Sequence, residues 1–212
     1  MAADKFVAVI DYGMGNLRSV QKGLEKVGVP AVIAERARFI NDAHGIILPG
    51  VGSFIDCMRN LEKHRLVTSI LRAISRGKPF LGICLGLQVL FSESEEFGIH
   101  PGLDVIKGKV VRFFGNGEKS GTALKVPHMG WNQIMIQKRP PVLASVPDGS
   151  YFYFVHSYYV KPEDPETVAT TTNYGVEFVS SIWKDNVFAC QFHPEKSQNL
   201  GLAILRAFGR LI

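Results

Sequence analysis

The first half of the chain alternates short apolar runs with apolar positions at helical spacing. The apolar runs predict buried strands at residues 6–10, 31–34, 45–48 and 79–83. Helical spacing predicts helices at residues 17–27, 54–61, 66–74 and 87–91. Ser53 is placed to cap the second of these helices. Such alternation is typical of βαβ units, so we expect a mostly parallel sheet with helices on both faces.

The second half changes to strand-like runs separated by turns, at residues 110–114, 131–136, 151–160, 168–172, 178–183 and 187–192. We expect these strands to be antiparallel and to extend the same sheet. Residues 199–212 predict a last helix, with Leu202, Leu205 and Phe208 on one side. The predicted fold class is therefore α/β: a single domain over residues 1–212, with an open mixed, mostly parallel sheet, helices on both faces and antiparallel strands added in the C-terminal half.

Composition and charge limit the class of protein, its cellular compartment and the partners that it can bind. The chain has 212 residues, of which 46% are hydrophobic and 20% charged, as is ordinary for a globular domain. The three cysteines are too few and too irregularly spaced for a disulfide framework, which indicates a cytoplasmic protein. The chain start predicts a first strand rather than a secretory signal, and no apolar stretch approaches the roughly 18 residues that span a bilayer. The net charge of +5 comes from scattered residues, so we expect neither nucleic-acid nor membrane binding.

The strongest local motif is Gly-Ile-Cys-Leu-Gly at residues 82–86, between a predicted strand and a predicted helix. This is the nucleophile-elbow pattern with cysteine in place of serine, and its glycines suit a turn without room for side chains. The turn places Cys84 at the carboxyl end of the sheet and near a helix N-terminus, which favours a thiolate. Taken alone, Cys84 is equally well interpreted as a small buried apolar residue, the interpretation that suits Cys57 and Cys190.

A nucleophilic cysteine needs a base and a group that orients the base. His193 follows a strand-like run, and Pro194 favours extended backbone at His193. Side chains two apart in an extended segment point the same way, so Glu195 can orient the imidazole. His128 and His156 are expected near the site as wall or structural residues. The acidic, histidine and cysteine residues show no metal-ligand spacing, so we predict no metal.

Acyl transfer also needs backbone N–H groups directed at the developing oxyanion. Leu85 follows the nucleophile and can supply one. The glycine-rich segment at residues 49–52 follows another parallel strand and should end at the same edge of the sheet. Its Val51 and Gly52 are candidates for the second donor, although an ordinary tight turn is the commoner meaning of such a segment.

Together these segments resemble the class I, or triad, glutamine amidotransferases. Leu-Pro-Gly-Val-Gly at 48–52, Gly-Ile-Cys-Leu-Gly-Leu-Gln at 82–88 and Phe-His-Pro-Glu at 192–195 carry the resemblance, which extends over essentially the whole chain. It implies a catalytic triad and a set of substrate-binding positions for glutamine, without a cofactor. The implied triad is Cys84, His193 and Glu195. The implied substrate-binding residues are Gly52, Gln88, Glu96, Ser157 and Tyr158.

Within this family, Asp-Tyr-Gly-Met-Gly-Asn-Leu at 11–17 and Pro-His-Met-Gly-Trp-Asn at 127–132 are similar to one subfamily. Its members supply ammonia to a separate cyclase subunit with a (β/α)8 barrel, in histidine biosynthesis. The resemblance therefore implies a heterodimer. We expect the partner interface to include Trp131, Asn132, Tyr153 and Lys196, because Lys196 follows the triad and tryptophan and tyrosine are favoured interface anchors. For Tyr153, a place in the core is an equally good interpretation.

Three alternatives stay open at this point. The chain could serve another triad amidotransferase, such as anthranilate synthase, although the segment 127–132 argues against this. It could be a cysteine hydrolase or chaperone of the same α/β shape, which would not need the His-Pro-Glu segment or Gln88. It could also be a non-catalytic, amidotransferase-like binding subunit, but its triad is complete.

Overall fold

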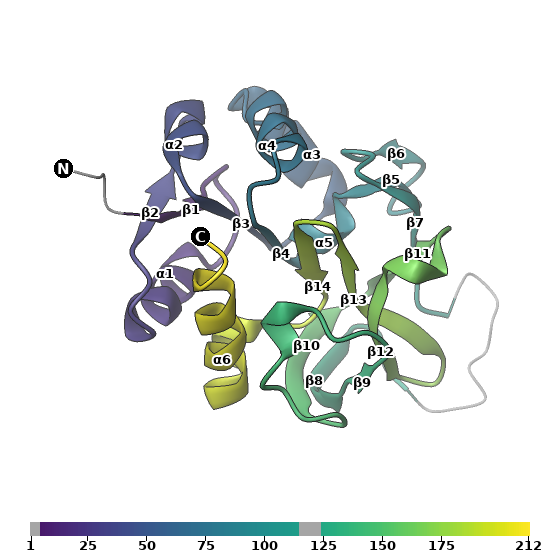
Figure 1. Cartoon of the computed structure of the whole chain (residues 1–212). Coiled ribbons are helices and arrows are strands. Elements are labelled where there is room, and N and C mark those ends of the chain that lie inside the picture. Colours follow the sequence, from purple (N-terminus) through teal and green to yellow (C-terminus); the bar gives the residue numbers. More distant parts are fainter. Residues whose placement is uncertain (1–4, 115–123) are drawn as a thin grey trace.

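The computed structural model describes residues 5–114 and 124–212, and a large twisted sheet runs through the molecule (Figure 1). Its strand order is β2-β1-β3-β4-β14-β13-β11-β7-β5-β6, with β12 paired to β13 and β9 paired to β12. The strands of the sheet are β1 (Val7–Ile10), β2 (Ala31–Ala34), β3 (Gly45–Gly50), β4 (Phe80–Cys84), β5 (Phe91–Ser94), β6 (His100–Pro101), β7 (Ile106–Arg112), β9 (Met135–Ile136), β11 (Tyr158–Pro162), β12 (Val168–Asn173), β13 (Glu177–Lys184) and β14 (Val187–Cys190). Two further strands, β8 (His128–Gln133) and β10 (Tyr151–His156), form a separate antiparallel ribbon.

The five strands β2, β1, β3, β4 and β14 are parallel to one another. Every residue of β1, β3, β4 and β14 is buried, as expected for parallel strands that are covered on both faces. Alternate residues of β1 enter different cores: Ala8 and Ile10 pack on one side of the sheet, and Val7 and Val9 on the other. This arrangement explains why the first half of the sequence shows continuous apolar runs instead of apolar-polar alternation.

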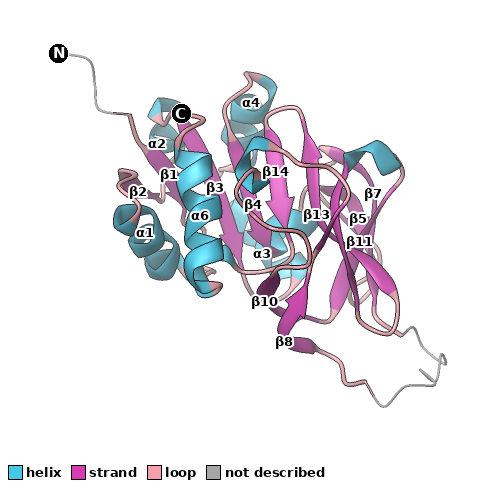
Figure 2. Ribbon diagram, turned by 60° about the horizontal axis from the view of Figure 1, so that its bottom comes forward, coloured by secondary structure: helices cyan, strands magenta, loops and turns pink. Residues whose placement is uncertain are grey.

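Helices cover both faces of this parallel half, which confirms the predicted layering (Figure 2). The α-helices are α1 (Leu17–Lys26), α2 (Ala37–Asp42), α3 (Phe54–Lys63), α4 (Val67–Ser75), α5 (Leu85–Gln88) and α6 (Gln198–Gly209), and the short 3₁₀ turns are η1 (Pro141–Leu143), η2 (Pro165–Thr167) and η3 (Pro194–Lys196). Helices α1 and α6 pack on one face, and α2, α3 and α4 on the other. Ser53 caps α3 as predicted, since its side chain accepts a hydrogen bond from the Asp56 N–H.

Antiparallel strands complete the sheet in the second half, also as predicted. Strand β13 is antiparallel to β14 and to β11, and β11 is antiparallel to β7. The single strand expected at residues 151–160 is wrong, however, because the chain breaks at Ser157 into β10 and β11. The expectation that all these strands join one sheet is also wrong for β8 and β10. Alternation of buried and exposed residues identifies a strand but does not reveal which neighbour it pairs with.

The helix predicted at residues 87–91 is wrong in its extent. Helix α5 ends at Gln88, and Phe91 begins β5, which pairs with β7 in parallel. A short apolar run of this kind fits a buried strand as well as a buried helix, and only the long-range pairing decides between them. Helix α2 was not predicted, since only one of its six residues, Ile40, is fully buried.

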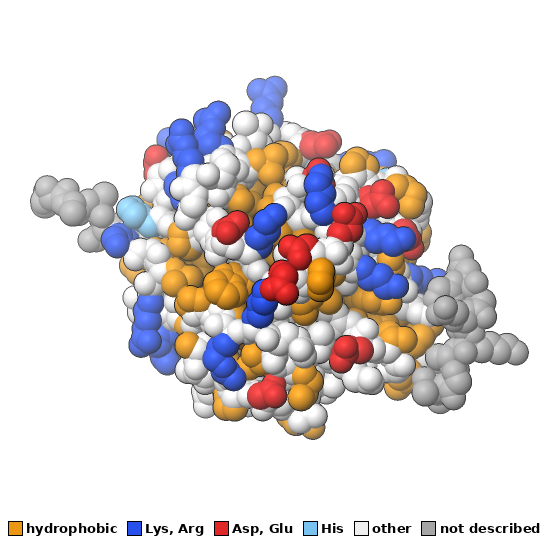
Figure 3. Space-filling view, turned by 45° about the vertical axis from the view of Figure 1, so that its right-hand side comes forward, with side chains coloured by type: hydrophobic (Ala, Val, Ile, Leu, Met, Phe, Trp, Pro, Cys, Tyr) orange, Lys and Arg blue, Asp and Glu red, His pale blue; other side chains and the backbone are white. Residues whose placement is uncertain are grey.

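The molecular surface shows no separation of charge on the face drawn in Figure 3, where basic, acidic and hydrophobic side chains are interspersed. None of the helices in the described ranges is long and apolar enough to cross a membrane.

Candidate active site

Cys84 lies at the turn where β4 passes into α5, at the carboxyl end of the parallel strands. Its backbone has φ 55° and ψ −107°, a strained conformation for a residue that carries a side chain. A Cβ added at Gly86 would lie 1.8 Å from the Leu48 carbonyl oxygen, and one at Gly82 would lie 2.6 Å from the Gly86 carbonyl oxygen. The two glycines therefore allow β3, β4 and α5 to approach closely enough to form the turn.

The three cysteines are all free thiols, but their surroundings differ. Cys57 and Cys190 are completely buried. Burial raises the pKa of Cys57 to about 12 and raises the pKa of Cys190 well above its ordinary value. Cys84 lines a large cavity. Among the three thiols, only that of Cys84 is placed to meet a small-molecule substrate.

A chain of amide side chains reaches the Cys84 sulfur. Gln191 Nε2 donates to Sγ of Cys84 over 3.5 Å, and Gln191 Oε1 accepts from Gln88 Nε2 over 3.0 Å. Gln88 Nε2 also donates to the Tyr158 carbonyl oxygen over 3.1 Å. Sequence reasoning gave Gln191 no role. Its signal is its position two residues before His193, which directs both side chains to the same side of an extended segment.

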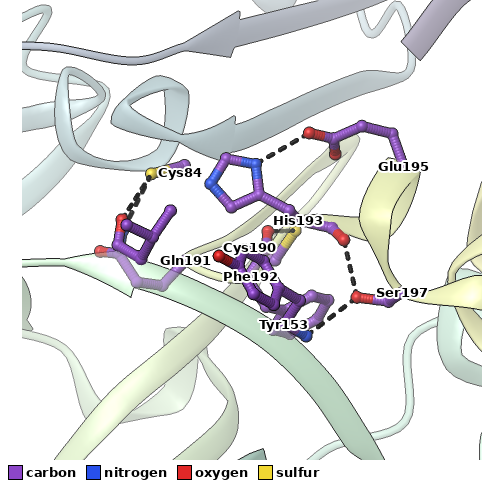
Figure 4. A network of polar contacts seen from close by, with 9 residues as sticks. Cys84, Tyr153, Cys190, Gln191, Phe192, His193, Glu195 and Ser197 are labelled. Carbon is purple, nitrogen blue, oxygen red and sulfur yellow. Dashed lines mark hydrogen bonds and ion pairs between the residues drawn. The ribbon is translucent and has the colours of Figure 1, made fainter. Parts of the chain in front are cut away.

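His193 and Glu195 meet at the end of β14. His193 Nδ1 lies 2.8 Å from Oε1 of Glu195, and each side chain is only 2% exposed (Figure 4). The backbone around the imidazole is held as well. The His193 N–H donates to the Tyr153 carbonyl, and the Ser197 hydroxyl donates to the His193 carbonyl. The ring therefore has little freedom to rotate away.

The second nitrogen of His193, Nε2, makes no hydrogen bond among the described residues, and the ring lies between Glu195 and Cys84 (Figure 4). Burial alone would lower the pKa of His193, but the Cys84 sulfur and the Glu195 carboxylate outweigh it and raise this pKa to about 10. The site therefore favours an imidazolium between two groups that can carry negative charge. Such an arrangement suits a nucleophilic thiolate with a histidine that exchanges protons.

A cavity of about 800 Å³ opens in front of Cys84, which is ample for an amino-acid substrate. It brings together the residues singled out from sequence as the nucleophile, its base and the oxyanion and substrate positions: Val51, Gly52, Cys84, Leu85, Gln88, Glu96, Ser157, Tyr158 and His193. Glu195 stands behind His193, as expected for an orienting group. Arg112, Pro127 and His156 also line the cavity and carried no substrate assignment.

Glu96 also lines this cavity. Its carboxylate accepts a hydrogen bond from the Phe54 N–H, at the N-terminus of α3, over 2.6 Å. Burial raises the pKa of Glu96. The carboxylate is thus held in a fixed position where a cationic group of a ligand would relieve the cost of its burial.

The segment of residues 49–52 packs directly against the elbow. Gly50 is registered beside Cys84 in the ladder between β3 and β4. A Cβ at Gly50 would lie 2.4 Å from the Tyr12 hydroxyl and 2.9 Å from Cβ of Leu85. Gly52 has φ +93°, a conformation that favours glycine. The candidate donors Val51, Gly52 and Leu85 therefore border the same side of the cavity.

His128 and His156 form a buried pair beside the cavity. His128 Nδ1 lies 2.9 Å from His156 Nε2, and His156 Nδ1 lies 2.8 Å from the Tyr158 carbonyl oxygen. Because a carbonyl only accepts, His156 donates from Nδ1 and accepts at Nε2 from His128. His128 Nε2 is then the acceptor for Asn132 Nδ2, at 3.2 Å. Burial lowers the pKa of His128 to about 4 and that of His156 to about 3, so both rings are neutral.

Of the four residues expected at a partner interface, Trp131 and Asn132 lie on β8, Tyr153 lies on β10 and Lys196 lies in η3. Trp131 is 46% exposed, and its ring contacts that of half-buried Tyr153 edge to face at 6.2 Å. Lys196 Nζ lies 5.7 Å from the centre of the Tyr153 ring, and this ring lies 6.4 Å from that of His193. Asn132 differs, because its side-chain amide donates to the Asn173 carbonyl and contacts His128. Trp131, Tyr153 and Lys196 thus form one cluster beside the triad, and Asn132 points into the chain.

No group of three or more His, Cys, Asp or Glu residues within 5–114 and 124–212 is arranged to hold a metal ion.

Comparison with known proteins agrees with this geometry. Residues 8–210 match the family model described as glutamine amidotransferase class-I, and the chain belongs to this family. Two solved structures of low sequence identity share the fold. One is a glutamine amidotransferase, 16% identical, with a TM-score of 0.73 and coverage of 97% of each chain. The other is PurLQS from Thermotoga maritima, 20% identical, with a TM-score of 0.70 and coverage of 99% of this chain and 98% of that one.

Within the family, the chain is similar to subunits of imidazole glycerol phosphate synthase. The chain is 58% identical over 205 residues to imidazole glycerol phosphate synthase subunit HisH of Geobacter sulfurreducens, which covers 97% of this chain and 98% of the relative. It is 53% identical over 203 residues to the subunit HisH of Aquifex aeolicus, which covers 95% of each. The chain therefore groups with the HisH subunits.

Proposed function

We propose that this chain is the glutaminase subunit of an imidazole glycerol phosphate synthase in histidine biosynthesis. It hydrolyses L-glutamine to glutamate and ammonia and passes the ammonia to a cyclase subunit. The observation that carries the proposal is the meeting of Cys84, at a strained strand-to-helix turn, with the His193–Glu195 pair at one wall of an 800 Å³ cavity. We also propose that residues 1–212 form a single amidotransferase domain. We further propose that the protein is cytoplasmic, which its three free thiols support.

The proposed reaction has two halves with opposite proton transfers. The Cys84 thiolate attacks the side-chain amide carbon of glutamine, and N–H groups of Val51 or Gly52 and of Leu85 stabilise the oxyanion. The carbon–nitrogen bond breaks as His193 donates a proton to the departing ammonia, which leaves a glutamyl thioester. His193 then takes a proton from water, whose oxygen attacks the thioester. The carbon–sulfur bond breaks, glutamate leaves and the thiolate is restored.

The substrate roles follow from charge and position around the cavity. Glu96 would receive the α-ammonium group of glutamine, because its buried carboxylate lacks a cationic partner among the described residues. Gln88, Gly52 and the backbone of Ser157 and Tyr158 would align the rest of the substrate. Glu195 orients His193 throughout.

The proposed partner is a cyclase with a (β/α)8 barrel. Ammonia released into neutral water would become ammonium, which is not a nucleophile, so the reaction favours a sealed path between two subunits. Trp131, Tyr153 and Lys196 would contact the cyclase, since their cluster adjoins His193 and contains exposed aromatic surface. Asn132 would belong to this interface through its backbone and through its support of the ribbon, because its side chain is engaged within the chain.

The test is glutamine hydrolysis with and without purified cyclase. Cys84→Ala should abolish it, while Cys190→Ala, at a completely buried thiol that does not line the cavity, should retain it. The complex with Cys84→Ala should still form imidazole glycerol phosphate when ammonium salt is added at high pH, since only the ammonia supply is lost. Retained hydrolysis in Cys84→Ala, or no hydrolysis by the wild-type complex, would contradict the proposal.

A further inference from the structure

The turn that follows β1 lies against the loop that carries the proposed oxyanion donors. A Cβ added at Gly52 would lie 2.6 Å from Cε of Met14, and one at Gly15 would lie 3.5 Å from the Pro49 carbonyl oxygen. Gly50 is even more closely packed, with the Tyr12 hydroxyl on one side and Leu85 of the elbow on the other. The position of the loop is therefore fixed from two directions.

Tyr12 connects the turn after β1 to the loop of residues 49–52. Within the described part of the chain, its hydrogen bond is the one between these two segments that involves a side chain. The pairing between β1 and β3 is registered only as far as Val9 and Ile47, whereas the pairing between β3 and β4 continues to Gly50 and Cys84. Beyond Ile47, β3 has lost its β1 partner. The Tyr12 hydroxyl donates to the Pro49 carbonyl oxygen over 3.0 Å and so replaces the missing backbone donor.

The environment of Tyr12 keeps its hydroxyl a donor. The side chain is completely buried, and burial raises the pKa of Tyr12 far above its ordinary value. The thiol of Cys57 contacts the same hydroxyl and is itself neutral, since burial raises its pKa to about 12. The Tyr12 hydroxyl therefore keeps its proton well above the ordinary range of a tyrosine and can donate it to the Pro49 carbonyl.

We propose that Tyr12 is a positioning residue for glutamine hydrolysis, and that its hydroxyl holds the loop of residues 49–52 so that the oxyanion donors face the elbow. This inference rests on the proposed function. Tyr12 touches neither the cavity nor the reacting atoms, and it acts through Pro49 and Gly50. Oxyanion donors act from about 3 Å, and a misplacement of about 1 Å can lower the rate about 100-fold.

The experiment compares two reactions of Cys84 in the complex with the cyclase. Glutamine hydrolysis develops an oxyanion, whereas alkylation by iodoacetamide tests the reactivity of the thiolate without one. Tyr12→Phe removes a single hydroxyl and should lower kcat for glutamine about tenfold or more, since a whole oxyanion donor contributes roughly 10²- to 10³-fold. KM should change less than about threefold, and the alkylation rate should be unchanged.

Tyr174→Phe is the matched control, because the Tyr174 hydroxyl donates to the Lys125 carbonyl over 2.8 Å in a part of the chain away from this loop. It should leave kcat and alkylation unchanged. As a second variant, p-aminophenylalanine at position 12 keeps both the ring and a donor, and it should restore most of the kcat. This variant serves as the test if Tyr12→Phe does not fold.

The outcomes separate the two proposals. Normal kcat in Tyr12→Phe, equal slowing of hydrolysis and alkylation, or no recovery with the amine would each overturn the role of Tyr12. If the wild-type complex does not hydrolyse glutamine at all, the proposed function fails instead.

Discussion

Acid should weaken this fold through the buried histidine pair, His128 and His156. Their pKa values, about 4 and about 3, lie below the value of 6.5 expected in an unfolded chain. Between pH 6.5 and pH 4.5 the unfolded chain therefore takes up protons that the folded chain does not bind. Stability is fully present above pH 6.5 and is lost as the pH falls towards the folded-state pKa values.

The size of this effect follows from the linkage relation. Each histidine contributes up to about 1.4 kcal/mol per pH unit to the slope of the unfolding free energy. Allowing for partial protonation near pH 6.5, each one removes about 2 kcal/mol between pH 6.5 and pH 4.5, and the pair removes about 4 kcal/mol. This is a large part of the 5–15 kcal/mol typical of a domain. His193 has a raised pKa, so its stabilising contribution is present below pH 6.5 and is lost only as the pH rises towards 10.

Urea unfolding followed by circular dichroism at pH 4.5, 5.5 and 6.5 measures this slope. His128→Gln removes one of the two buried imidazoles and should reduce the slope by about 1 kcal/mol per pH unit. The variant also loses stacking on Phe154 and Tyr174, which lowers stability at every pH and leaves the slope unaffected. His64→Gln is the control, since His64 is exposed. An unchanged slope in His128→Gln would refute the reasoning.

Three further predictions concern the elbow, the triad and the partner. Gly86→Ala places a Cβ 1.8 Å from the Leu48 carbonyl oxygen. It should lower the free energy of unfolding by about 3 kcal/mol and lower kcat more than about 100-fold. Hydrolysis within threefold of wild type would show that the elbow tolerates the methyl group. Glu195→Gln should lower kcat roughly 10²- to 10⁴-fold in steady-state assays. This loss should be smaller than that in His193→Ala, because an orienting group is the least essential member of a triad. A larger loss than in His193→Ala would count against this role. Trp131→Ala should weaken cyclase binding about tenfold or more in titration calorimetry while circular dichroism stays unchanged, whereas normal affinity would place the interface elsewhere.

The sequence predicted the parallel half of the fold well because each of its strands is buried on both faces. Strands β1, β3, β4 and β14 are therefore apolar runs that need no knowledge of their neighbours. The ribbon of β8 and β10 could not be predicted in this way. Its residues alternate like those of any half-buried strand, and its separation from the sheet depends on contacts between segments about twenty residues apart.

In the candidate site, too, features that depend on local sequence could be predicted and features that depend on long-range contacts could not. Cys84 and the His193–Glu195 pair could be recognised because each depends on local backbone: a glycine-flanked turn in one case, and side chains two apart on extended chain in the other. Gln191 and Tyr12 could not be assigned a role, and His128 and His156 could be placed near the site but not paired with each other, since the partners of all four lie far away in the sequence. Neutral polar side chains inside a fold depend on which acceptor the tertiary structure brings to them.

The close approach of Gly86 to Leu48 also has a consequence for protein engineering. On the elbow side the cavity is bounded by backbone that touches backbone, so substitutions there have no space to occupy. The rim of the cavity contains Phe97, which is 82% exposed, and the exposed Arg112, at the end of β7. A library designed to accept amides other than glutamine should therefore diversify the rim and leave the elbow untouched, because new side chains at the rim extend into solvent.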